Sequence, residues 1–105
     1  MQERSNDAVI IETRFGVAQV LSGKTSFRIT ACPLRHETVR GSLARIADQN
    51  MRFYDTVLYP KTLQLREGIV VLLNDSLIDR YPKGLDTALR GRDRILILPL
   101  AEGGD

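Results

Sequence analysis

Three runs of aliphatic and β-branched residues predict buried strands. Residues 8–13 read Ala-Val-Ile-Ile-Glu-Thr, residues 69–73 read Ile-Val-Val-Leu-Leu, and residues 94–98 read Arg-Ile-Leu-Ile-Leu. β-branched residues favour strands, and a near-continuous apolar run indicates a strand that is buried on both faces. We therefore expect the three segments to belong to one sheet, with residues 8–13 as a central strand.

A further strand is predicted at residues 25–30, where apolar and polar side chains alternate. Phe27 and Ile29 share one face, and the other face is polar. Such alternation predicts a strand with one exposed face. We expect this segment to form a hairpin with residues 8–13 and to lie at the outside of the sheet.

One amphipathic helix is predicted over residues 38–50. Thr38 can act as the N-cap residue, because its hydroxyl can accept a hydrogen bond from the first turn. Apolar side chains recur at helical spacing at Val39, Leu43, Ile46 and Ala47. The helix is expected to cover one face of the sheet.

The remaining segments are predicted to be connections. Residues 52–67 show no regular period and are expected to form a long loop. Asn74-Asp75-Ser76 favours a turn, after which residues 77–81 are expected to pair back on the sheet. Residues 84–90 fit a single helical turn, because they hold two leucines four residues apart.

The order of these elements predicts an α+β fold, a mixed sheet with one main helix across one face. For the helix to return the chain to the same sheet, the first and last strands must lie side by side in its middle. The chain has 105 residues, which is the size of one domain. We expect this domain to span residues 1–101 and a flexible tail to span residues 102–105.

Composition excludes several classes of function. Fifteen Lys and Arg are interleaved with thirteen Asp and Glu, and the formal net charge is only +2. So small a bias gives no reason to expect a nucleic-acid partner. A single cysteine cannot form an internal disulfide, and no segment resembles a signal peptide or a membrane span. We expect a cytoplasmic protein with no membrane partner.

The C-terminal tail carries the strongest functional signal, the pair Gly103-Gly104 followed by Asp105. Glycines lack a Cβ and adopt backbone angles closed to other residues, so the pair can thread a narrow channel. A tail of this kind suits the delivery of a carboxylate into the active site of another protein. The opposing interpretation is a frayed chain end without function.

Other candidate sites have less support. Cys32 has no second cysteine or base nearby and fits a small buried hydrophobic residue. His36 adjoins Glu37 but lacks partners at the spacing of a catalytic triad or a metal site, so we expect it at the surface. Gly23-Lys24-Thr25 lacks the first glycine and the helix of a phosphate-binding loop. We therefore predict no catalytic residue, no metal site and no bound cofactor.

The order of elements and four motifs resemble the β-grasp fold of ubiquitin and, more closely, the MoaD and ThiS sulfur carriers. The motifs span most of the chain: Thr38-Val39-Arg40 at the helix start, Gly68-Ile69-Val70-Val71 leading to Asn74-Asp75, Leu85 to Leu89 before Asp93, and Ile97-Leu98-Pro99 leading to Gly103-Gly104. Two positions depart from the family pattern. Arg92 precedes Asp93 where the family has glycine, which predicts a rearranged turn, and Asp105 follows the glycine that bears the family's terminal carboxylate.

The resemblance implies a sulfur carrier without catalytic residues of its own. A ubiquitin-activating-type adenylating enzyme would use ATP to adenylate Gly104, and a sulfur nucleophile would convert the adenylate to a thiocarboxylate, with Gly103 providing reach. The acceptor would be a synthase subunit of the molybdopterin synthase large subunit or thiazole synthase type, in molybdopterin- or thiamin-type cofactor biosynthesis. Because Asp105 blocks this chemistry, a protease would first remove it.

Partners must also hold the folded body while the tail enters their active site. Leu98 and Leu100, beside the tail, are candidates for this docking surface, although core packing competes for both leucines. Tyr54, Tyr59 and Arg66 are further candidates, because tyrosine and arginine are enriched in interface hot spots.

Two other functions stay open. In a ubiquitin-like modifier, the activated Gly104 would be transferred to a lysine amine. In a non-covalent binding subunit, the β-grasp body would dock to an enzyme complex and the tail would be only a terminus. The presence of Asp105 favours this last function.

Overall fold

The computed structural model describes residues 8–14, 23, 26–31 and 37–99. The described strands and helices are, in chain order, β1 (Val9–Arg14), β2 (Ser26–Ala31), α2 (Val39–Gln49), α3 (Arg52–Thr56), β3 (Ile69–Leu73), β4 (Ser76–Leu77), the 3₁₀ turns η2 (Ile78–Arg80) and η3 (Gly84–Asp86), and β5 (Arg94–Pro99). Cys32 and His36 lie outside the described residues, so their predicted roles stay predictions.

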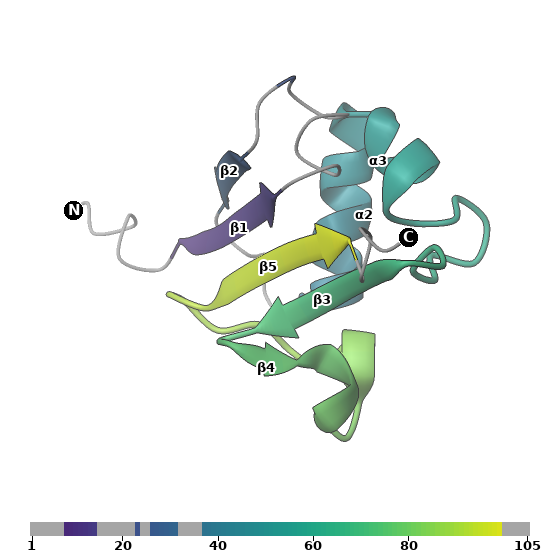
Figure 1. The fold of residues 1–105 in the computed structure, drawn as a ribbon. Helices are drawn as coiled ribbons and strands as arrows, with labels where there is room; N and C mark the ends of the chain where they lie inside the picture. Colours follow the sequence, from purple (N-terminus) through teal and green to yellow (C-terminus); the bar gives the residue numbers. More distant parts are fainter. Residues whose placement is uncertain (1–7, 15–22, 24–25, 32–36, 100–105) are drawn as a thin grey trace.

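Five strands form one mixed sheet in the order β2-β1-β5-β3-β4 (Figure 1). β1 pairs antiparallel with β2 and parallel with β5, and Ile11 lies opposite both Ile29 and Ile95. On its other side β5 pairs antiparallel with β3, where Pro99 lies opposite Ile69. The predicted parallel pair in the middle of the sheet and the predicted outer strand β2 are confirmed.

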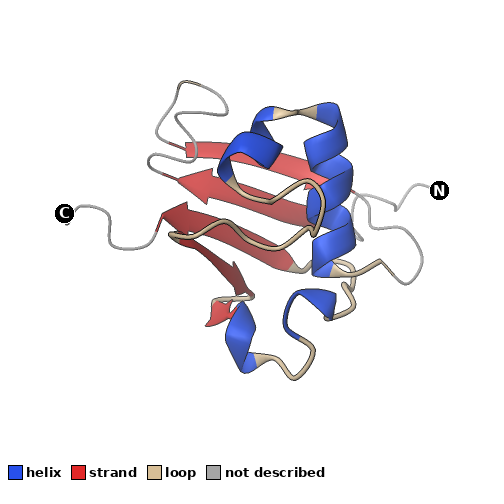
Figure 2. Cartoon of the chain, turned by 90° about the vertical axis from the view of Figure 1, so that its right-hand side faces the viewer, coloured by secondary structure: helices blue, strands red, loops and turns tan. Residues whose placement is uncertain are grey.

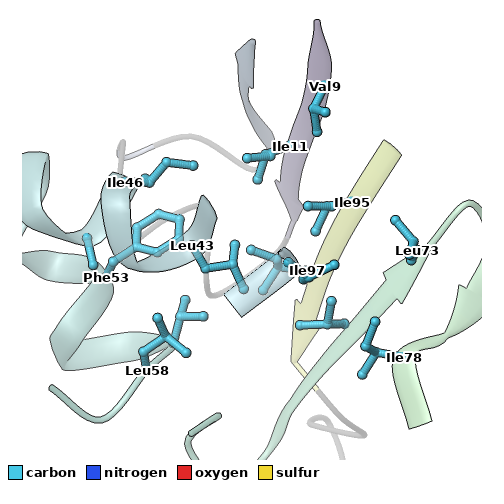
Figure 3. Close-up of a cluster of buried hydrophobic side chains, with 14 of the residues drawn as sticks. Val9, Ile11, Leu43, Ile46, Phe53, Leu58, Leu73, Ile78, Ile95 and Ile97 are labelled. Atoms are coloured by element: carbon cyan, nitrogen blue, oxygen red, sulfur yellow. The ribbon is translucent and has the colours of Figure 1, made fainter. Parts of the chain in front are cut away.

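The hydrophobic core lies between one face of the sheet and the helices α2 and α3 (Figure 2). Figure 3 shows Leu43 and Ile46 of α2 facing Ile11 and Ile97 of the sheet. Full burial of such an aliphatic side chain contributes about 1.5–3 kcal/mol. The largest side chains that are almost completely excluded from solvent in the described part of the chain are Phe53, Ile11, Leu43, Leu58, Ile95, Ile97, Val9, Val39, Val57, Val71 and Thr13.

β1 is buried on one face only, so the prediction of burial on both faces is wrong. Val9 and Ile11 are 1% and 0% exposed, whereas Ile10 and Glu12 on the other face keep some exposure to solvent. The physical reason is that both described α-helices cover the same side of the sheet (Figure 2). The opposite side is a surface of the described domain.

α2 forms where the sequence predicts it. Thr38 is extended, and its Oγ1 accepts a hydrogen bond from the Gly41 amide at 3.0 Å. The helix runs to Gln49 and is capped by Asn50, whose amide donates to the Ile46 carbonyl. The positions that predicted the helix all face the core: Val39, Leu43, Ile46 and Ala47.

The loop predicted over residues 52–67 begins instead with the short helix α3. Phe53 is fully buried, and its carbonyl accepts a hydrogen bond from the Val57 amide at 2.7 Å. The Asn50 side chain accepts a hydrogen bond from the Arg52 amide at the start of the helix. A five-residue helix with a single buried side chain leaves no periodic signal in the sequence, which is why the loop prediction is wrong here.

The chain after β3 pairs less than predicted. β4 has two residues and pairs only with Leu72 and Leu73. The next three residues form η2, which buries Ile78 in the core, so the pairing predicted over residues 77–81 is wrong beyond its first residue. The helical turn predicted over residues 84–90 is η3, which takes only the first three of them.

Two turns meet at the start of β5. Asn74 and Asp75 have φ of +52° and +73°, as in the type I′ turn that joins two hairpin strands. The Asn74 side chain accepts a hydrogen bond from the Arg94 amide and donates one to Asp93 Oδ1, each at 2.9 Å. Arg92 has φ +73°, the conformation that favours glycine. Arg92 therefore adopts a backbone conformation in which glycine is common, and the predicted rearrangement relative to the family stays a prediction.

Candidate functional site

The C-terminal tail leaves the domain from the end of β5. The last described residue, Pro99, lies opposite Ile69 at the start of β3. The structure therefore defines the body that presents the tail. Four predicted site residues lie outside the described part of the chain, and their roles, like the tail boundary at residue 102, stay predictions: Leu100, Gly103, Gly104 and Asp105.

The sheet face opposite the helices, here called the open face, carries an aliphatic strip beside this exit. Successive strand residues point to opposite faces, so Leu96 and Leu98 point away from the core. The strand register places Val70 opposite Leu98, and Leu72 opposite both Leu96 and Leu77. Leu77 is 42% exposed and the other four are half-buried. The strip gives the open face an apolar contact surface that includes the predicted docking residue Leu98.

Charged side chains occupy the open face on β1 and β2. Glu12 lies opposite Arg28 in the strand register. Its carboxylate is 2.8 Å from Arg14 Nη2 and 3.8 Å from Arg28 Nη2. The Glu12 side chain is only 12% exposed, whereas the two arginine side chains are 47% and 63% exposed. This half of the face therefore presents two accessible cations around one sheltered carboxylate.

Tyr54, Tyr59 and Arg66 form a second surface, here called the tyrosine-arginine cluster. The Arg66 Cζ lies 4.5 Å from the centroid of the Tyr59 ring, and Arg66 Nε donates to the Tyr54 carbonyl at 2.7 Å. The cluster is attached to α3 on the helix side of the sheet, whereas Leu98 lies on the open face. The structure thus brings three predicted docking residues together and separates them from the fourth described one.

Two tyrosine hydroxyls in this region donate to carboxylates. The Tyr54 hydroxyl donates to Asp48 Oδ1 at 2.7 Å, and this hydrogen bond is the main reason why the pKa of Tyr54 is raised. The Tyr59 hydroxyl donates to Glu67 Oε1, which raises the pKa of Tyr59 and lowers the pKa of the Glu67 carboxyl. Both tyrosines are therefore fixed as neutral hydrogen-bond donors, and Glu67 as an ionised acceptor.

Sequence reasoning missed two arginines that hold the helix side together. Arg40 Nη1 donates to the Leu63 carbonyl at 2.7 Å, and its Nε donates to Asp86 Oδ1 at 2.9 Å. Arg45 donates through two nitrogens to the buried carboxylate of Glu37, at 2.8 and 2.9 Å. The partners of Arg40 are 23 and 46 residues away, so no local spacing could predict them.

The described residues hold no cluster of metal-binding side chains and no membrane-spanning helix. Among them, no group of three or more His, Cys, Asp or Glu side chains is placed to hold a metal ion. None of the helices in this part of the chain has the length and apolar character needed to cross a bilayer.

A comparison with protein families gives a match to the ThiS family over residues 34–104. The match covers α2, α3, the strands β3 to β5 and both glycines of the tail, and its last residue is Gly104. The chain belongs to the ThiS family. The resemblance to the MoaD and ThiS sulfur carriers is thereby confirmed, and with it membership of a family of small ubiquitin-like carriers that are not catalysts themselves.

Solved structures show the same β-grasp fold. Urm1 from Trypanosoma brucei aligns over 99% of this chain and 100% of its own, with 18% identity and a TM-score of 0.73. Small archaeal modifier protein 1 of Haloferax volcanii aligns over 90% of this chain and 98% of its own, with 18% identity and a TM-score of 0.66. A chain of the BexX/CysO complex of Amycolatopsis orientalis aligns over 91% and 99%, with 19% identity and a TM-score of 0.66. A search of curated proteins gave no match.

Proposed function

We propose that this chain is a sulfur carrier whose Gly104 is adenylated by a partner enzyme and converted to a thiocarboxylate. The product would serve cofactor biosynthesis of the molybdopterin or thiamin type. Asp105 would be removed before the first step, so that Gly104 bears the terminal carboxylate. The chain would bind no cofactor, and the ATP would be bound and consumed by the partner.

The observation that supports this function best is the extent of the family match. It continues past the folded domain, through Gly103 and Gly104, and stops before Asp105. A body that only docked to another protein would need no likeness in a tail beyond Pro99. The likeness in the tail is expected if the tail itself is the reacting group.

The chemistry explains why the terminal residue must be a glycine carboxylate. A carboxylate oxygen attacks the α-phosphorus of ATP, pyrophosphate leaves, and the acyl carbon becomes bonded to AMP. A sulfur nucleophile at the oxidation level of hydrosulfide then attacks that carbon, and AMP leaves with the electrons of the broken C–O bond. A side chain at residue 104 would obstruct a channel shaped for glycine, and residue 105 would occupy the carboxylate in a peptide bond.

The open face is a suitable surface for the adenylating partner. It adjoins the tail exit and combines the aliphatic strip with the exposed guanidinium groups of Arg14 and Arg28. Partly apolar surfaces with arginine at their margin are typical of protein interfaces. In this proposal Leu98 helps to dock the body while the tail reaches into the enzyme.

The direct test uses two shortened chains that end at residue 104. The chain ending in Gly104 should support ATP–pyrophosphate exchange by the adenylating enzyme purified from the same host. The matched chain with Gly104→Ala should lose most of this activity, and its urea unfolding midpoint should equal that of the Gly104 form. Equal exchange by the two chains would contradict the proposed role of Gly104.

A second candidate function is a ubiquitin-like modifier, which the likeness to the small archaeal modifier protein of Haloferax volcanii favours. It shares the adenylation step but transfers Gly104 to a lysine amine. A non-covalent binding subunit is the third candidate, favoured by Asp105. The intact mass of the protein from its own host separates the three: a terminal oxygen replaced by sulfur supports the carrier, a conjugate supports the modifier, and an active full-length chain with Asp105 retained supports the subunit.

A further inference from the structure

Arg66 lies beside the point from which the tail leaves the domain. Its carbonyl accepts a hydrogen bond from the amide of Ile69, at 3.2 Å, and Ile69 is the residue paired with Pro99. The loop that carries Arg66 therefore ends against the last pair of the β3–β5 ladder, at the end of the sheet where β5 finishes (Figure 1). Any enzyme that draws the tail into its active site must bring its surface close to this loop.

The guanidinium of Arg66 is held in place before any partner arrives. It stacks over the Tyr59 ring, and its Nε donates a hydrogen bond to the Tyr54 carbonyl. Tyr59 is fixed in turn by its hydroxyl, which donates to Glu67. A preorganised arginine loses less side-chain entropy on binding than a free one, which makes it a favourable contact for an acidic group.

Arg66 makes no ion pair within the described part of the chain, although its charge helps to lower the pKa of the neighbouring Glu67 carboxyl. No carboxylate there lies within 4.0 Å of its nitrogens, in contrast to the ion pairs of Arg40 with Asp86 and of Arg45 with Glu37. Its sequence neighbour Glu67 accepts from Tyr59 instead. Among the described residues the terminal nitrogens of Arg66 have no hydrogen-bond acceptor, so they are available to an anion outside this part of the chain, and a planar pair of donors matches a carboxylate.

The length of the tail determines which anion of the partner could reach Arg66. From Pro99 to Gly104 there are five residues, which span about 17 Å when extended. The nucleotide that reacts with Gly104 would thus lie far from Arg66 while the tail is inserted. A group at the rim of the partner, and not a phosphate of ATP, is within reach.

We infer that Arg66, positioned by Tyr59 and the Tyr54 carbonyl, binds an aspartate or glutamate at the rim of the enzyme channel that receives the tail. The inference rests on the proposed function and names one determinant of partner choice within it. Arg66 takes no part in the chemistry. Its contribution is to productive docking and to rejection of enzymes that lack an acidic residue at this position.

The test measures ATP–pyrophosphate exchange as a function of carrier concentration, with chains ending at Gly104 and the adenylating enzyme of the same host. Arg66→Gln should raise KM for the carrier about tenfold and leave kcat unchanged, since the substituted group is remote from the reacting carboxylate. The matched control is Arg90→Gln, the same change of charge at an exposed arginine near the opposite end of β5. Its KM should stay within twofold of the parent.

Further variants separate charge from structure. Tyr59→Phe keeps the stacked ring but loses the hydroxyl that fixes it, so KM should rise less than in Arg66→Gln. Arg66→Lys keeps the charge, so its KM should rise with ionic strength as the parent's does, whereas Arg66→Gln should show a weaker salt dependence. Equal salt dependence in all three chains would overturn the inference, as would a KM for Arg66→Gln equal to that of Arg90→Gln.

Two other results of the exchange assay can be distinguished from these. If Arg66 instead binds Glu102 of its own tail, Glu102→Gln will raise KM as much as Arg66→Gln and the double variant will show no further rise, which overturns the inference. If the parent chain supports no exchange at all, the proposed function itself fails and the inference fails with it. Exchange by the parent with an unchanged KM for Arg66→Gln rejects only the role of Arg66.

Discussion

The substitution Asn74→Ala should destabilise the domain by roughly 2–3 kcal/mol. Asn74 has φ +52°, a conformation that asparagine tolerates and that costs alanine about 1 kcal/mol more. Its side chain also makes two hydrogen bonds of 2.9 Å, one from the Arg94 amide and one to Asp93. Each contributes about 0.5–1.5 kcal/mol, with the lower part of that range applying to exposed groups such as these. The sum corresponds to a fall in Tm of about 10–15 °C for a domain of this size.

Urea unfolding followed by far-UV circular dichroism would measure the effect, with Asn74→Gly as the matched control. Glycine accepts positive φ without strain but makes neither side-chain hydrogen bond, so it should lose about 1 kcal/mol less than alanine. The two variants together separate the backbone cost from the cost of the lost hydrogen bonds. A loss below 0.5 kcal/mol for Asn74→Ala, or equal losses for the two variants, would refute this account of the turn.

Three further changes have defined outcomes. Asp75→Gly should stabilise the domain by about 0.5–1 kcal/mol, because Asn-Gly is a preferred pair for a type I′ turn and Asp75 has φ +73°; urea unfolding would show it. Gly41→Ala should stabilise α2 by about 0.5 kcal/mol, since its Cβ would meet Thr38 Oγ1 at an acceptable 3.4 Å; an unchanged midpoint would contradict this. Tyr59→Phe should raise the pKa of the Glu67 carboxyl towards its ordinary value of 4.5, measured by NMR titration, because the Tyr59 hydroxyl is the main cause of the lowering. The stability that this pair contributes is present above pH 4.5 and is lost as the pH falls through the lowered pKa of Glu67, so the variant should lack that acid-side loss.

The sequence predicted those elements in which several side chains indicate the same secondary structure and the same buried face. Residues 69–73 form β3 with the predicted bounds, because five consecutive apolar residues in a strand-sized run fit little else. α2 was equally clear, since Thr38 and four apolar positions agree on one helix. α3 has only Phe53 to indicate its buried side. One apolar residue fits a helix and a loop equally well, so that element became visible only in the structure.

The burial of β1 shows a second limit of sequence patterns. Ile10 is apolar, which suggested a strand covered on both faces, yet it lies on the open face beside Glu12 and Arg14. Glu12 and Arg14 alternate with buried neighbours, and this alternation indicates the exposed face of β1 better than the apolar run does. Residues that are two apart in a strand share a face, so a carboxylate and an arginine at that spacing can pair on a solvent-facing side.

For the candidate site, the sequence identified residue types but could not group them. Tyr59 and Arg66 are seven residues apart, and their stacking depends on the path of the loop after α3. That path is set by buried Val57 and Leu58 and by contacts such as that between Arg40 and Leu63. Contacts of this kind arise from the folded chain as a whole, which local spacing does not encode.

In the proposed function the two ends of β5 have separate tasks, and this separation makes the proposals independently testable. The start of the strand is held by Asn74 and Asp93, whereas its end, beside Arg66, releases the tail. Between its ends β5 is paired on both sides in the middle of the sheet, so we expect the loss of a contact at one end to leave the pairing at the other end intact. Asn74→Ala should therefore lower stability without changing KM for the adenylating enzyme at temperatures where the domain stays folded. A rise in KM in that variant would mean that the turn and the tail are coupled through β5, and the KM effect of Arg66→Gln could then no longer be assigned to direct contact with the enzyme.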